Sequence, residues 1–74
     1  MGYILIDKET DDGGWHKISS EMPPRTSDVE VLSEDGTTKE ATIVVEVSGW
    51  FLYFEKEGWG RMDKYESWRF RKEN

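Results

Sequence analysis

The sequence predicts a mostly β fold: a small single domain with one antiparallel sheet of four or five strands, curled or partly closed as a small barrel, with at most one short helix. The first reason is a pair of β-rich runs, residues 41–47 and 50–54, which flank residues 48–49 as two strands flank a tight hairpin turn. The second reason is the alternation of apolar and polar side chains in residues 29–33 and 66–71. This alternation has the period of a half-buried strand.

The front of the chain, residues 1–14, is expected to form a short strand followed by an acidic loop or arm. Tyr3–Ile6 is apolar and long enough for one strand, and whether it joins the sheet is left open. Lys8–Gly14 is polar and ends in two glycines, which is typical of a loop. The β domain is predicted to span residues 15–71, with residues 72–74 as a polar tail.

The middle of the chain is expected to contain three strands. Val29–Ser33 is followed by a turn at residues 34–36, and residues 39–47 form the next strand. Trp50–Phe54 is apolar on both faces, which predicts a central strand or one covered on both sides. The core face of the 39–47 strand should carry Ala41, Ile43, Val45 and Val47.

The last part of the chain is expected to hold a loop, one helical turn and a final strand. The loop is residues 57–61, the helical turn lies within Met62–Glu66, and the strand directs Trp68 and Phe70 into the core. Val45, Trp50 and Trp68 are expected to be buried together, because the hairpin and the last strand have the strongest apolar faces.

Length and composition limit what kind of protein this is. The chain of 74 residues has no cysteine, which excludes a disulfide and a thiolate zinc site. Its stability must come from burial of its four tryptophans, three tyrosines and three phenylalanines, or from a partner. The apolar run before Asp7 is too short for a signal peptide or a membrane span, so we expect a cytoplasmic protein without membrane attachment.

The formal net charge of −6 lies entirely in the front half. Residues 1–40 hold ten of the sixteen acidic and four of the ten basic residues, and the remaining residues are neutral overall. Such a field repels phosphate and attracts basic protein surfaces, although a charge of this size also serves solubility alone. We therefore expect a protein with a basic surface as partner and no direct binding of nucleic acid, and self-association into a homo-oligomer is left open.

Short motifs in the chain resemble a known family. They occur in the order Trp15-x-x-Ile18-Ser19-x-x-x-Pro23, Val29-x-Val31, Asp35-Gly36, Ala41, Gly49-Trp50 and Trp68. Over about residues 15–70 this is similar to the short phage and prophage proteins grouped as domain of unknown function 551. That family usually closes with a Thr-His-Trp-like triplet and a proline-rich tail, whereas here Glu66-Ser67-Trp68 is followed by no proline, and residues 1–14 lie outside the pattern. The resemblance implies a phage-associated accessory protein and brings no site residues.

No constellation of residues specifies a reaction. His16 is the only histidine and is interpreted as an exposed loop imidazole beside Trp15. The carboxylate pairs Asp11-Asp12 and Glu34-Asp35 lie in polar stretches without the ligand spacing of a calcium loop. We therefore predict no catalytic residue, metal site or cofactor, although a minor enzyme that uses a carboxylate pair is a third class of function.

The function expected from the sequence is binding without catalysis. One concrete form is an acidic phage inhibitor of a host defence or nucleic-acid-processing protein, of the anti-CRISPR or anti-restriction type; the alternative is a small structural or oligomer-forming domain. Trp59, between two glycines, is either a binding anchor or a cap on the core. The candidate partner-binding residues are Asp11, Asp12, Glu34, Asp35, Trp59 and Arg61.

Overall fold

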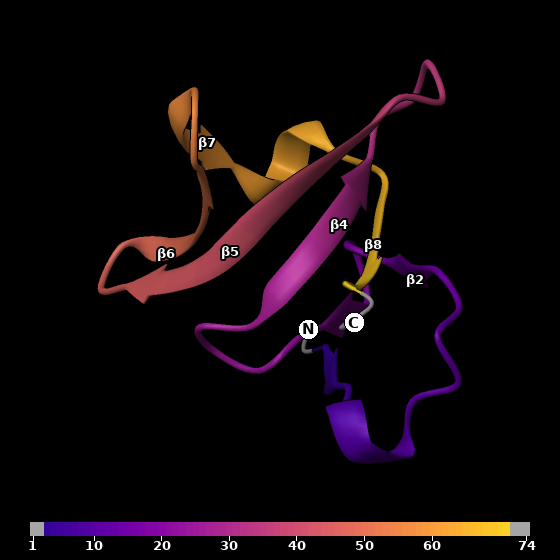
Figure 1. Ribbon diagram of the computed structural model, residues 1–74. Helices are drawn as coiled ribbons and strands as arrows, with labels where there is room; N and C mark the ends of the chain where they lie inside the picture. Colours follow the sequence, from indigo (N-terminus) through magenta and orange to yellow (C-terminus); the bar gives the residue numbers. More distant parts are fainter. Residues whose placement is uncertain (1–2, 72–74) are drawn as a thin grey trace.

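The computed structural model describes residues 3–71 (Figure 1). The elements follow in the order β1 (Ile4–Leu5), the 3-10 helix η1 (Lys8–Thr10), β2 (His16–Lys17), β3 (Glu21–Met22), β4 (Asp28–Leu32), β5 (Thr38–Glu46), β6 (Gly49–Phe54), β7 (Gly58–Arg61), the 3-10 helix η2 (Met62–Lys64) and β8 (Ser67–Phe70). Six strands form one sheet in the order β2-β8-β4-β5-β6-β7, and all neighbours are antiparallel. Strands β1 and β3 form a separate parallel pair.

The predicted mostly β fold with an antiparallel sheet is confirmed, with three differences in detail. The sheet has six strands, because two segments expected to be loops form its edges, β2 and β7. It stays open and does not close into a barrel, since its two edge strands do not pair with each other. Within residues 3–71 there is no α-helix, only the expected turn η2 and the additional turn η1. The predicted polar tail, residues 72–74, lies outside the described residues.

The β5–β6 hairpin turns one residue earlier than predicted. Glu46 pairs with Gly49, so Val47 and Ser48 form the turn and Gly49, at φ +138°, begins the next strand. A glycine adopts this φ without strain. Val47 is therefore fully exposed, and its prediction as a core residue was wrong. Ile43 on the same strand is completely buried, as predicted.

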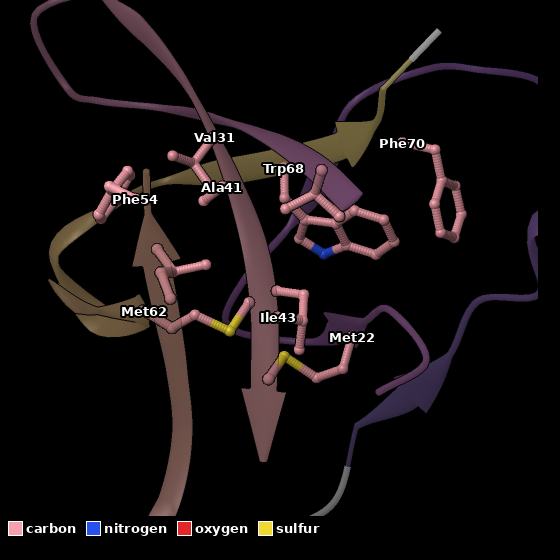
Figure 2. Packing of buried hydrophobic residues seen from close by; sticks show 10 residues of the cluster. Met22, Val31, Ala41, Ile43, Phe54, Met62, Trp68 and Phe70 are labelled. Atoms are coloured by element: carbon pink, nitrogen blue, oxygen red, sulfur yellow. The ribbon is translucent and has the colours of Figure 1, made fainter. Parts of the chain in front are cut away.

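The core lies on one side of the sheet, called here the inner face. Its buried strand residues are Val29, Val31, Ala41, Ile43, Leu52, Phe54, Trp68 and Phe70. Met22 of the small β1–β3 pair and Met62 of η2 pack over them, and Figure 2 shows both thioethers beside Ile43. Methionine suits this position because its flexible side chain fills irregular gaps.

The opposite side of the sheet, the outer face, is open. β6 is central, between β5 and β7, as predicted, but it is not covered on both sides. Leu52 and Phe54 are buried on the inner face, whereas Tyr53 is 42% exposed on the outer face. A sheet with one solvated face is common in antiparallel architecture.

Trp68 and Trp50 should differ sharply when replaced by alanine. Trp68 is completely buried, so Trp68→Ala should cost about 3–5 kcal/mol, close to the whole stability of a domain this small. Trp50 is only half-buried at the margin of the core, where it contacts Tyr3, so it does not share the burial expected for it. Trp50→Ala should leave a folded protein with a lower melting temperature. Chemical denaturation measures both variants, and equal losses would contradict this account of the core.

Candidate protein-binding surface

The six candidate residues do not form one site. Asp11 and Asp12 follow η1 at the bottom of Figure 1, whereas Glu34 and Asp35 lie in the β4–β5 turn at its upper right. Trp59 and Arg61 lie on β7, at the upper left. The structure therefore separates the acidic pairs from each other and brings together only the two residues of β7.

The acidic candidates are not equally available to a partner. The Asp11 side chain is only 5% exposed and is bonded to His16. Asp12 accepts a hydrogen bond from the Gly14 amide. Asp35 accepts bonds from the hydroxyl and the amide of Thr37, which lower the pKa of its carboxyl.

Trp59 lies in a strand, so the interpretation of residues 57–61 as a loop was wrong. Strand β7 pairs with β6 in a register that places Trp59 opposite Tyr53. The two rings meet edge to face, with centroids 5.3 Å apart and planes at 68°. Trp59 remains 64% exposed. Because this pair lies on the outer face, Trp59 does not cap the inner core.

The aromatic pair is the centre of a larger apolar surface. By strand alternation and register, Val44 and Phe51 lie on the same face as Tyr53 and Trp59, one pair further along the strands. Arg61 is opposite Phe51, and its guanidinium donates to Asp63 at 2.8 Å. We call this surface the outer-face patch; it consists of Val44, Phe51, Tyr53, Trp59 and Arg61.

The aromatic and basic run at the end of the chain forms a structural strand. Trp68 and Phe70 face the core, as the alternation predicted. Arg69 donates to Glu30 at 2.8 Å and lies 4.3 Å from the Trp15 ring centroid. Arg71 reaches Asp28 at 3.1 Å. Both arginines are thus held by carboxylates of this chain.

His16 is the residue whose surroundings the sequence analysis missed. It lies in β2, is half-buried, and stacks on Trp68 with ring centroids 4.7 Å apart, so it is not an exposed loop imidazole. Its Nε2 contacts Asp11 Oδ1 at 2.5 Å and its Nδ1 contacts Glu21 Oε1 at 2.6 Å. The equal spacing of five residues on each side of His16 was the available signal, but only tertiary folding brings the three side chains together.

This arrangement, called here the His16 clasp (Asp11, His16 and Glu21), suits a protonated imidazole. Burial lowers the pKa of His16, but the hydrogen bonds to Glu21 and Asp11 and the charges of both carboxylates outweigh it, so the pKa is raised above 6.5. An imidazolium can donate from both nitrogens, one to each carboxylate. With both nitrogens engaged, neither is available as a general base.

Two further findings concern metals and membranes. In residues 3–71, no three histidine, cysteine or acidic side chains are grouped so that they could hold a metal ion. The same part of the chain contains no helix with the length and apolar character needed to cross a bilayer.

Comparisons with models of protein families, with curated proteins and with solved structures found no match for this chain. The resemblance to the phage family therefore stays a prediction.

The His16 clasp predicts a specific dependence of stability on pH. Because the pKa is raised in the folded state, the stabilisation is fully present below the ordinary value of 6.5 and is lost as the pH rises through the folded pKa. Asp7 and Asp12 line the same hollow as His16 and Asp11.

Denaturation curves of wild type and His16→Gln, taken from roughly pH 5.5 to 9, measure this contribution. The wild type should be the more stable protein at the acidic end, and the difference should shrink as the pH rises. A difference that is the same at every pH would contradict a charged clasp.

Proposed function

We propose that this protein is a binding protein without catalytic activity, which docks on the basic surface of another protein through the outer-face patch. The observation that supports this most directly is the exposed pair Tyr53 and Trp59 on the uncovered face of the sheet. Tryptophan, tyrosine and arginine are the residues most enriched in binding hot spots. Tryptophan and tyrosine bury much area with few rotatable bonds. Both ring types also attract the cationic groups of lysine and arginine.

The charges around the patch favour a basic partner. Alternation places Glu40 and Glu46 on the outer face of β5, on either side of Thr42 and Val44. Both glutamates are exposed. Together with the net charge of −6, they steer a basic protein toward this face and repel nucleic acid.

The resemblance to phage proteins suggests a biological form for this binding. A phage accessory protein of this kind would inhibit a host defence or nucleic-acid-processing protein, of the anti-CRISPR or anti-restriction type, by occupying a basic groove meant for nucleic acid. The alternative is an oligomer-forming domain, in which a second copy covers the same patch. The like charge of two copies opposes that alternative.

Quantitative affinity capture from a bacterial lysate tests the proposal with three proteins: wild type, Trp59→Ala and Ile4→Ser. Ile4 is a matched control, because it is as exposed as Trp59 (66% against 64%) but lies on β1, away from β7 in Figure 1. Proteins retained by wild type and Ile4→Ser but lost by Trp59→Ala should be basic, and raised salt should release them. If the same proteins are retained by all three, the patch is not the binding site.

Once a partner has been identified in this way, its binding kinetics should distinguish the effect of the exposed carboxylates from the effect of the Trp59 contact. Glu34→Lys/Glu46→Lys changes two exposed carboxylates, so it should slow association and flatten its salt dependence. Trp59→Ala should instead raise the dissociation rate by roughly tenfold or more, with little dependence on salt. Surface plasmon resonance at several salt concentrations measures both rates. An unchanged association rate in the lysine variant would exclude steering by these acids.

A further inference from the structure

Strand β5 has a neighbouring strand on both sides over only part of its length. Strand β4 pairs with β5 over Thr38–Thr42, whereas β6 pairs with it only over Thr42–Glu46. Toward the Thr38 end of β5, β6 no longer pairs with it. After Phe54 the chain turns through residues 55–57 into β7. Within the described part of the chain, residues 38–41 therefore have a strand on one side only.

The backbone geometry shows which amide and carbonyl groups of this segment face away from β4. The Ile43 amide donates to the Ser27 carbonyl at 2.9 Å and its carbonyl accepts from the Thr26 amide at 3.0 Å, so both groups of Ile43 point to the β4 side. Successive residues of a strand point their amide and carbonyl groups to opposite sides. The corresponding groups of Thr38 and Glu40 therefore point to the side that β6 has left, where no described strand receives them.

A hollow lies at this open edge. Its volume is about 460 Å³, and it is lined by residues 39–42 of β5, by residues 53–57 and by Arg71. Tyr53 of the outer-face patch lines it, so the hollow and the patch adjoin. The Lys39–Glu57 ion pair spans from β5 to the 55–57 turn, and both side chains are exposed. An exposed ion pair of this kind opens at little cost.

We propose that an extended segment of the basic partner adds to the sheet as a strand along residues 38–41 of β5, between β5 and the 55–57 turn. This inference rests on the proposed function and names its mode of binding. Open amide and carbonyl groups select an extended backbone, since only a strand satisfies donors and acceptors in this alternating pattern. Side chains of the added strand that face outward lie beside Tyr53 and Glu40. The Tyr53 ring suits lysine or arginine, and Glu40 exchanges its exposed ion pair with Arg71, at 3.6 Å, for one with the added cation.

A short synthetic peptide in which lysine and valine alternate, blocked at both ends, serves as the probe. Its binding to the full chain is followed by NMR through chemical shifts and amide exchange. The amides of Thr38 and Glu40 should exchange roughly tenfold more slowly with the peptide bound, because they become hydrogen-bonded. If the peptide does not bind, or if protection appears at β7 instead, the proposal is overturned.

A proline at position 40 tests the strand addition directly. The amide of Glu40 points to the open side, so Glu40→Pro removes a donor for the peptide without removing a bond to β4. Glu40→Gln is the matched control, because it keeps the amide and, like the proline variant, loses the charge and the ion pair with Arg71 at 3.6 Å. Glu40→Pro should bind the peptide at least about tenfold more weakly than Glu40→Gln. Equal binding by the two variants would overturn the proposal.

Two further measurements keep the outcome unambiguous. If Glu40→Pro has a lower melting temperature than Glu40→Gln, a peptide with every backbone amide N-methylated replaces the variant, since it has no donor for the open carbonyl groups of β5 in either strand orientation. It should bind wild type at least about tenfold more weakly than the unmodified peptide, and equal binding would overturn the proposal. Loss of peptide binding in Glu40→Pro together with unchanged partner capture by Trp59→Ala would refute the outer-face patch and leave strand addition in place. The reverse pattern would refute strand addition alone.

Discussion

The buried indole of Trp68 is the contact on which the rest of the structure depends. It is completely buried, packs edge to face on Phe70 at 5.0 Å, and donates from Nε1 to the Glu21 carbonyl at 2.6 Å. His16 stacks on its other side. One ring thus joins the last strand, the core and the front segment, in a chain that has no disulfide to connect them.

The small size of the protein explains why the outer face of its main sheet is open. Within residues 3–71, Met22 of the β1–β3 pair and Met62 of η2 cover the inner face, whereas Tyr53 and Trp59 on the outer face remain exposed. Gly60 has a special part in this arrangement, because a Cβ there would lie 2.6 Å from the Phe54 ring. The absence of that side chain lets β7 pair with β6 beneath Phe54. This pairing presents Trp59 on the outer face.

The acidic front half is less uniform than the net charge suggests. Asp11 and Glu21 neutralise a histidine, and Asp28 and Glu30 hold the arginines of the last strand. These carboxylates stabilise the fold, since each is paired within the chain. Other exposed acids, such as Glu34 in the front half and Glu46 on β5, leave their charge to act on the surrounding solvent. Structure and charge thus divide the acidic residues into two groups that composition alone does not distinguish.

The sequence by itself determined the elements whose pattern is local. Alternation of apolar and polar residues indicated β4 and β8 and the inward direction of Trp68, the β-rich run indicated β5, and Gly36 marked the turn between β4 and β5. These features follow from the period of two along one strand and from the positive φ that glycine allows.

Only the tertiary structure decided the features that depend on a neighbour. The two glycines that flank Trp59 predicted a loop. In the structure this segment is a strand because it pairs with β6, where Trp59 lies opposite Tyr53. The sequence around His16 predicted a loop imidazole. In the structure the fold places Asp11, Glu21 and Trp68 around its ring. Residues 38–41 of β5 have an open side because β6 pairs with β5 only over Thr42–Glu46. Each of these is a relation between strands, which the propensity of any one residue does not encode.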